Sequence, residues 1–422
     1  MMGARFRRRL PPALRSRDYA LLWVALLVSN FGTQMTAVAV GWQVYAIHRS
    51  ALDLGLVGLC TFIPLPLLAL PAGHLSDRFS RRRIFAIATF LETGVVALLL
   101  VVSLSGARQL WPFLALAAAT GTTAAIGIPP GRALPAMVVP YEIIQSAMAL
   151  RAIAFQIAVI TGPALGGFLF IVSPQLVYGI GVGMLALGVV AILAVDEPRS
   201  TPLSEPLSLN SVFAGIRFIR ATPVLLGAIT LDLFAVLFGG AIALAPVFAR
   251  TILHTGPAGL GLLRSAPAVG AVAAGVLLAH RPLRSHAGRT LLIVVAIFGA
   301  TQVVFGLSNW LWLSLLALAI SGFVDMYSMN IRGATVALAT PDELRGRVLA
   351  VEMVFISASN ELGAFESGAA AALFGTVASV VAGGAVTIGL AGASMKLWPA
   401  LARIDRLEDL RPDGAGAIAA SG

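Results

Sequence analysis

Charged residues are scarce in this chain of 422 residues: they make up 11% of it, whereas 58% of the residues are hydrophobic. A soluble domain carries roughly 25% charged residues, so a soluble protein of this composition would have almost no polar surface to expose to water. A lipid bilayer removes that difficulty, because side chains that face lipid should be apolar. The composition therefore excludes a soluble globular protein and predicts an α-helical membrane protein.

Lysine and cysteine are almost absent, with one of each, Lys396 and Cys60. A phosphate-binding loop requires lysine between glycine and serine or threonine, but Lys396 follows methionine and precedes leucine. A pump that hydrolyses ATP within this chain is therefore excluded. The single cysteine excludes a structural disulfide and a cysteine metal cage, and we expect no cofactor.

Apolar runs long enough to cross a membrane recur along the whole chain. A transmembrane helix needs about 20 mostly apolar residues. The run after Tyr19 is too long for a signal-peptide core, so it is interpreted as a retained first span. We predict twelve spans, at 19–47, 52–75, 84–104, 109–132, 147–172, 174–195, 223–249, 256–280, 290–307, 309–331, 349–374 and 377–399.

The net charge of +10 comes from basic residues clustered between these runs. No nucleic-acid partner is expected, because the arginines form no basic stripe with interleaved aromatic residues. Twelve spans put both termini on one side, and the loops of the opposite side hold only Arg49, Arg108 and Arg250. Cytoplasmic loops collect lysine and arginine, so we predict a multi-pass protein of a bacterial cytoplasmic (inner) membrane with both termini in the cytoplasm.

The longest polar stretch inside the chain, 196–222, separates six spans from six spans. Within this linker, residues 208–221 predict a short amphipathic helix, with Val212, Ile216 and Ile219 on one side and Arg217 and Arg220 on the other. We therefore predict an N-terminal six-helix bundle at 1–195, a cytoplasmic linker at 196–222, a C-terminal six-helix bundle at 223–400 and a cytoplasmic tail at 401–422.

The two halves look like repeats, from which many transporter folds are built. Gly58 and Pro64 match Gly261 and Pro267 at a common offset of 203 residues. Arg132, Pro140 and Glu142 match Arg332, Pro341 and Glu343 at an offset near 201 residues. These matches fall at equivalent points of the two halves, which favours a duplicated architecture.

The loop after the second span resembles the signature loop of the major facilitator superfamily: a glycine, an aspartate–arginine pair and further basic residues. The residues that carry the resemblance are Gly73, Asp77, Arg78, Arg81 and Arg82. The resemblance implies two pseudo-symmetric six-helix bundles, alternating access and a gating role for this loop. The family's second glycine is replaced by Ser80, which predicts a tighter or strained turn. The alternative is a plain positive-inside loop.

A stretch of the fifth span resembles the antiporter motif of the same family through Gly162, Pro163, Gly166 and Gly167. The resemblance implies outward transport. The alternative is a kinked helix whose small residues permit close packing and say nothing about direction.

The end of the fourth span, around Arg132 and Pro140, resembles the branch of enterobactin-type siderophore exporters and macrolide efflux pumps. The resemblance implies a monomeric carrier that exports a siderophore or an amphiphilic drug by proton antiport. The proton-coupling motif of other drug exporters is not recognisable in span 4, so the coupling ion stays open. A lipid flippase and a small-molecule importer of the same fold are alternatives, as is a membrane-embedded enzyme, for which the sequence shows no nucleophile–base set.

Polar residues inside the spans are candidates for function, because a charge at the bilayer centre costs about 2.5–3.5 kcal/mol. Asp325, Ser328 and Arg332 share one helical face. In the family's fold, spans 1, 4, 7 and 10 line the cavity. We therefore predict a substrate cavity lined by Asn30, Gln34, Arg132, Asp232, Asp325, Ser328 and Arg332. The alternative is an internal network in which Asp325 neutralises Arg332.

Carboxylates within the spans are candidates for carrying the coupled proton. We predict that one of Asp232, Asp325, Glu361 or Glu366 does so, with Arg264 as a partner of Glu366. The alternative is a set of static ion pairs. Glu352 and Arg151 occupy repeat-equivalent positions and suggest a structural or gating role, whereas Glu92 has no predicted partner.

Overall fold

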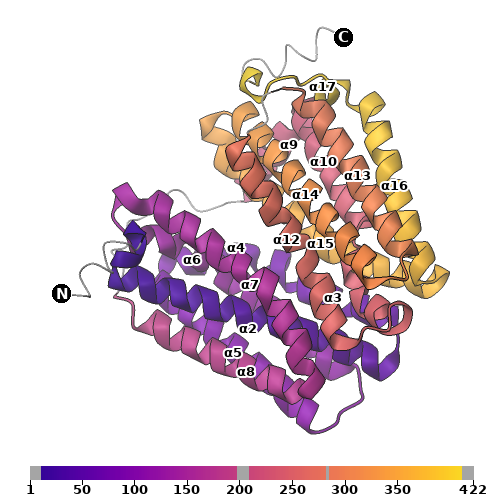
Figure 1. The fold of residues 1–422 in the computed structure, drawn as a ribbon. Coiled ribbons are helices and arrows are strands. Elements are labelled where there is room, and N and C mark those ends of the chain that lie inside the picture. The colour runs from indigo at the N-terminus through magenta and orange to yellow at the C-terminus, as the bar shows by residue number, and fades with distance from the viewer. Residues whose placement is uncertain (1–10, 197–208, 282–284, 411–422) are drawn as a thin grey trace. The chain divides into compact units, whose positions relative to one another are not determined.

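The computed structural model describes residues 11–196, 209–281 and 285–410, and within these ranges it is helical without a β-strand (Figure 1). Twelve of its helical segments are long and apolar enough to cross a membrane. The prediction of a twelve-span α-helical membrane protein is therefore confirmed. Parts of the predicted N-terminal bundle, linker and tail lie outside the described residues, at 1–10, 197–208 and 411–422.

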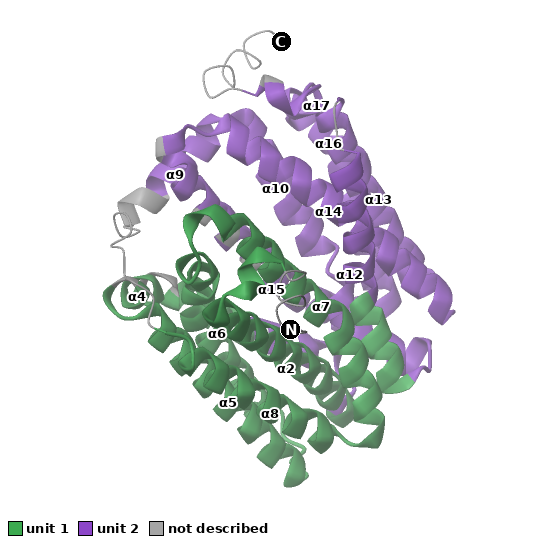
Figure 2. Ribbon diagram, turned by 60° about the vertical axis from the view of Figure 1, so that its left-hand side comes forward, with its two compact units in different colours: residues 1–47, 60–206, 256–265 green, residues 48–59, 207–255, 266–422 purple. Residues whose placement is uncertain are grey.

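The chain forms two compact units, shown in Figure 2. Unit 1 contains residues 1–47, 60–206 and 256–265, and unit 2 contains residues 48–59, 207–255 and 266–422. Each unit therefore includes a short segment from the other half of the sequence. The predicted division of the chain at the linker stays a prediction.

Unit 1 is an α-helical bundle in which α5 packs against both α6 and α8. Its polar contacts join helices far apart in sequence: the buried Tyr178 hydroxyl donates to Gln43 Oε1 at 2.8 Å, and Gln43 Nε2 donates to Ser103 Oγ at 3.3 Å. Its helices are α2 (Arg17–His48), α4 (Pro64–Arg78), α5 (Arg81–Leu104), α6 (Trp111–Met137), α7 (Ile144–Val172) and α8 (Pro174–Leu193).

The glycines of α7 bring this helix into close contact with α2. A Cβ atom on Gly162 would lie 2.8 Å from Gln34 Cβ, and one on Gly166 would lie 3.0 Å from the Met35 backbone. A Cβ on Gly167 would overlap the carbonyl oxygen of Pro257, at the start of α12 (Gly256–His280). Larger residues would force these helices apart, so the motif forms a packing surface within unit 1.

Unit 2 places α13 between α14 and α16, and α10 against α15 and α16. Glycine again permits close crossings: a Cβ on Gly270 of α12 would overlap the carbonyl oxygen of Ala319, and one on Gly322 of α14 would overlap that of Pro267. Its main helices are α3 (Ala51–Phe62), α9 (Leu209–Ala221), α10 (Pro223–Phe238), the later part of α12, α13 (Ala287–Leu307), α14 (Leu311–Ala339), α15 (Asp342–Phe374) and α16 (Thr376–Leu397).

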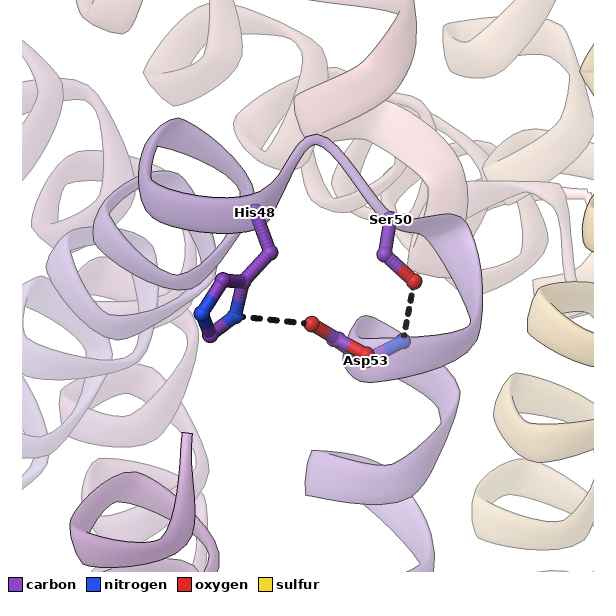
Figure 3. Close-up of polar contacts among 3 residues, drawn as sticks. All are labelled: His48, Ser50 and Asp53. Atoms are coloured by element: carbon purple, nitrogen blue, oxygen red, sulfur yellow. Dashed lines mark hydrogen bonds and ion pairs between the residues drawn. The ribbon is translucent and has the colours of Figure 1, made fainter. Parts of the chain in front are cut away.

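The start of α3 is fixed by a local polar cap (Figure 3). Ser50 Oγ accepts a hydrogen bond from the Asp53 backbone N–H at 3.2 Å, and His48 Nδ1 lies 3.0 Å from Asp53 Oδ2. A helix commonly begins at a residue whose side chain accepts a hydrogen bond from a free backbone N–H of the first turn. Farther along α3, a Cβ on Gly58 would contact Ala364 of α15 at 3.1 Å.

Gly58 and Gly261, which the repeat offset pairs, both lie at close helix crossings. Gly58 faces α15 in unit 2, and a Cβ on Gly261 would lie 2.5 Å from the carbonyl oxygen of Pro163 on α7 in unit 1. The like environments of two equivalent glycines support the duplicated architecture.

The seventh span is interrupted. Helix α10 ends at Phe238, and after Gly239 and Gly240 the chain continues as a 3₁₀ turn (Ala241–Leu244), α11 (Ala245–Val247) and a π-helical turn (Phe248–Ile252). Two successive glycines favour a break, because they gain the most freedom outside a helix. A Cβ on Gly240 would lie 3.1 Å from both Gly363 O and Ser367 Oγ of α15. The break therefore brings the backbone of span 7 against α15.

Candidate functional site

The centre of the candidate site is a buried ion pair in unit 2. Arg332 Nη1 of α14 lies 2.5 Å from Asp232 Oδ2 of α10, and their side chains are 5% and 8% exposed. The neighbours of each residue in sequence, Ile331 and Leu231, belong to the same apolar core. Because a buried charge is tolerated only when it is paired, α10 and α14 are held together by opposite charges inside an apolar bundle.

Two further carboxylates act on the same guanidinium. Asp325, two turns earlier on α14, and Glu352 of α15 both interact electrostatically with Arg332, and Asp232 interacts with all three of these groups. Three carboxylates and one guanidinium sum to a formal charge of −2 when all are ionised. An apolar surrounding opposes that excess, so the cluster is suited to binding a proton or another cation.

Ser328 and Arg332, on the face of α14 predicted from the sequence, are both buried. The contact partner of Arg332 differs from the predicted network, since the ion pair is formed with Asp232 rather than with Asp325. The Nε atom of Arg332 is buried and has no hydrogen-bond partner among the described residues. The guanidinium therefore keeps a donor available for a second acceptor.

Glu361 and Glu366 lie farther along α15 than this cluster. They follow Glu352 by 9 and 14 residues, which is about 13 and 21 Å along a helix axis. A Cβ on Gly58 would lie 3.6 Å from the Glu361 carboxylate, so that side chain is next to α3. Arg264 belongs to unit 1 and Glu366 to unit 2, and their pairing stays a prediction.

The candidates of unit 1 occupy three different environments. The Asn30 side chain donates to the backbone carbonyl of Leu26 on its own helix at 2.6 Å. Gln34 packs against Gly162, and Arg132 is exposed on α6. Their role as substrate contacts stays a prediction.

Sequence reasoning missed the partner of Glu92. Its carboxylate on α5 accepts a hydrogen bond from Thr33 Oγ1 of α2 at 3.0 Å. The available signal was a threonine beside Gln34 in an apolar span. A threonine hydroxyl can instead bond to its own helix, and the single Thr33 O–H is shared between Glu92 and the Ser29 carbonyl, which also lies 3.0 Å away.

The loop between α4 and α5 connects helix ends within unit 1. Arg82 Nη1 donates to the carbonyls of Val195 and Leu193, at the end of α8, and Arg81 Nη1 lies 3.3 Å from Met137 Sδ at the end of α6. Cations are favoured at helix C-termini, so the two arginines connect the start of α5 to the ends of α6 and α8. Arg78 lies 6.0 Å from the Phe79 ring centroid, and the Asp77 side chain is outside the described residues.

The turn itself is relaxed, contrary to the expectation drawn from Ser80. Ser80 has φ of −56°, outside the region that favours glycine, and its Oγ caps α5 by accepting from Arg83 N at 3.4 Å. A serine side chain therefore replaces the family's glycine with a helix cap. A Cβ on Gly73 would meet no described atom within 4 Å, so this glycine is not at a close crossing.

Comparisons with known proteins agree over nearly the whole chain. A family model described as transmembrane secretion effector matches residues 10–412. The multidrug efflux pump Tap of Mycolicibacterium fortuitum is 27% identical over 378 residues, covering 86% of this chain and 91% of the relative. The enterobactin exporter EntS of Shigella flexneri is 25% identical over 384 residues, covering 88% of each.

Solved structures show the same fold at low sequence identity. A bacterial homologue of the human lysosomal transporter Spinster superposes with a TM-score of 0.69 at 15% identity, covering 92% of this chain and 97% of the other. A bacterial homologue of the iron transporter ferroportin superposes with a TM-score of 0.68 at 15% identity, covering 92% and 99%.

Proposed function

The chain belongs to the transmembrane secretion effector family of the major facilitator superfamily, and we propose that it exports a siderophore or an amphiphilic drug by proton antiport. It is a membrane transporter and not an enzyme. Export is supported by the names of its relatives, a multidrug efflux pump and an enterobactin exporter. In this proposal the monomer works by alternating access in the bacterial cytoplasmic membrane, with both termini in the cytoplasm.

The observation that carries the proton-coupling proposal is the buried Arg332–Asp232 pair beside two further carboxylates. A proton that binds Asp232 removes the charge that holds Arg332. The guanidinium is then free to pair with Asp325 or Glu352, which already act on it electrostatically. Because α10, α14 and α15 each contribute one or more of these groups, exchange of partners changes the forces between three spans.

The substrate contacts follow from the same cluster. Asp325 and Ser328 share the face of α14 that carries Arg332, and we propose that the substrate competes there for the partners of Arg332. The coupling then requires no second site, since the substrate and the proton act on one set of charges. In unit 1, the proposed substrate contacts remain Asn30, Gln34 and Arg132. Further candidates for a role in proton coupling are Glu361, Glu366 and Arg264.

The proposal is tested by accumulation in bacteria that lack their own efflux pumps. Cells expressing the protein should retain less ethidium, an amphiphilic cation, or less of the siderophore enterobactin than cells expressing Asp232→Asn. A protonophore should abolish the difference. Higher retention in cells with the wild-type protein would identify an importer, and unchanged retention of both probes would favour lipid transport; either result would contradict the proposal.

A further inference from the structure

Helix α9 presents a basic and aromatic face away from the protein. Phe213, Arg217 and Arg220 are all exposed, Phe213 by 60%. Their spacing of four and three residues puts them on one side of the helix. Gly215 and Ile219, on the other side, are buried. The described part of α9 is thus two-sided, while the side chain of Val212 lies outside the described residues.

The buried side of α9 is seated on two membrane spans of its own unit. A Cβ on Gly215 would lie 3.0 Å from the Arg347 carbonyl oxygen and 3.1 Å from Val351 Cγ2. Ile219 belongs to the same apolar core as Ile229 of α10 and Val351 of α15. Because both buried positions are packed against these spans, α9 cannot rotate its arginines inward without breaking the packing.

These contacts seat α9 near the beginnings of two of the candidate membrane spans. Ile229 is the seventh residue of the span Pro223–Ile252, and Val351 is the eighth of the span Leu344–Phe374. Each therefore lies within about 11 Å of the beginning of its span, at 1.5 Å per residue. The polar headgroup layer is about 5–8 Å thick on each side of the hydrocarbon core, so a helix seated on the first turns of two spans lies within reach of lipid headgroups.

The charges on that face are uncompensated by the described chain. Neither Arg217 nor Arg220 forms an ion pair with an acidic side chain of the described residues, whereas the nearby Arg345 is paired with Asp342 at 2.7 Å. Guanidinium groups bind phosphate strongly, and basic helices with an exposed aromatic side chain bind anionic membranes.

We propose that the Phe213–Arg217–Arg220 face is a binding surface for anionic phospholipid headgroups. The two arginines contact lipid phosphates, and the Phe213 ring inserts among the upper acyl chains. Bound lipid then holds α9, and with it the beginnings of α10 and α15, at the interface. This proposal is independent of the transported substrate and of the coupling ion.

The test uses the full chain, with Cys60→Ala as background and a spin label attached through Phe213→Cys. The label's access to oxygen, which concentrates in lipid, is compared with its access to a water-soluble nickel chelate. We expect oxygen access to rise and nickel access to fall when phosphatidylglycerol is added to phosphatidylcholine vesicles. Arg217→Gln with Arg220→Gln should raise the phosphatidylglycerol concentration that is needed for this response about 30-fold, as expected for the loss of two arginines at a membrane surface.

Two variants control for folding and for total charge. Arg217→Lys with Arg220→Lys should keep the phosphatidylglycerol response, and Arg403→Gln with Arg406→Gln, which removes two exposed arginines elsewhere, should leave it unchanged. A label equally open to the nickel chelate in both kinds of vesicle would overturn the proposal, because the face would then point to water. A label equally immersed in both would also overturn it, because anionic headgroups would not be recognised.

Discussion

Arg332 and Asp232 form a 2.5 Å ion pair between two membrane spans, with both side chains nearly inaccessible to solvent. A pair of this kind adds little net stability by itself, but the loss of one partner leaves a buried charge. Asp325 and Glu352 interact electrostatically with the same guanidinium, so the site combines one arginine with three carboxylates. Transport and stability should therefore respond differently to changes in each carboxylate.

Asp232→Asn should lower the free energy of unfolding by up to about 3 kcal/mol, because Arg332 loses its contact partner and only Asp325 and Glu352 remain to compensate its charge. Thermal unfolding of the purified protein in detergent measures this. Asp325→Asn is the matched control: it removes a carboxylate but leaves the ion pair intact, so its effect on unfolding should be smaller. Equal destabilisation by both variants would contradict the assignment of Asp232 as the contact partner.

Gly166→Ala should destabilise the protein by about 1–3 kcal/mol, the usual cost of overpacking. The added methyl group would lie 3.0 Å from backbone atoms of Met35, which cannot move aside without shifting α2. Gly179→Ala on α8 is the control, because a Cβ there meets no atom within 4 Å. If Gly166→Ala is as stable as Gly179→Ala in thermal unfolding but blocks transport, the motif has a role beyond packing.

Tyr178→Phe should cost about 1 kcal/mol of stability through the loss of one buried hydrogen bond. The Tyr178 hydroxyl donates to Gln43 Oε1 at 2.8 Å and joins α8 to α2. Tyr141→Phe removes the same atom from a side chain that is 87% exposed and should have no measurable effect. Indistinguishable unfolding temperatures for the two variants would show that the Gln43 contact contributes nothing.

The orientation in the membrane can be checked with single cysteines introduced on the Cys60→Ala background. His74 and Ser105 are both exposed; His74 lies between the second and third spans, and Ser105 directly follows the third. In intact cells, a membrane-impermeant maleimide should label Ser105→Cys and leave His74→Cys unlabelled until the cells are opened. The reverse pattern would place both termini outside the cytoplasm.

The parts of the structure that could be predicted are those imposed by the lipid. Span number follows from apolar length, because each segment must satisfy its backbone hydrogen bonds within a helix. The shared face of Asp325, Ser328 and Arg332 follows from helical periodicity alone. Tertiary partners do not follow from it: Asp232 is 100 residues from Arg332, and the nearer Asp325 appeared the better candidate.

Breaks within spans were also missed. Gly239 and Gly240 lie in a continuous apolar run, and glycine is common in intact membrane helices. The tertiary contact at the break, where a Cβ on Gly240 would lie 3.1 Å from Gly363 O and Ser367 Oγ, is not visible in the sequence. The Glu92–Thr33 bond is similar, since it depends on the packing of α2 against α5 and not on a sequence pattern.

Transport in proteoliposomes tests whether the Arg332–Asp232 pair controls proton-driven export. The purified protein is reconstituted, an acid-inside pH gradient is imposed, and uptake of ethidium and of enterobactin is measured. We predict gradient-dependent uptake of at least one probe by the wild-type protein, abolished by nigericin and absent from Asp232→Asn. Uptake that is unaffected by nigericin, or that Asp232→Asn retains in full, would contradict the claim.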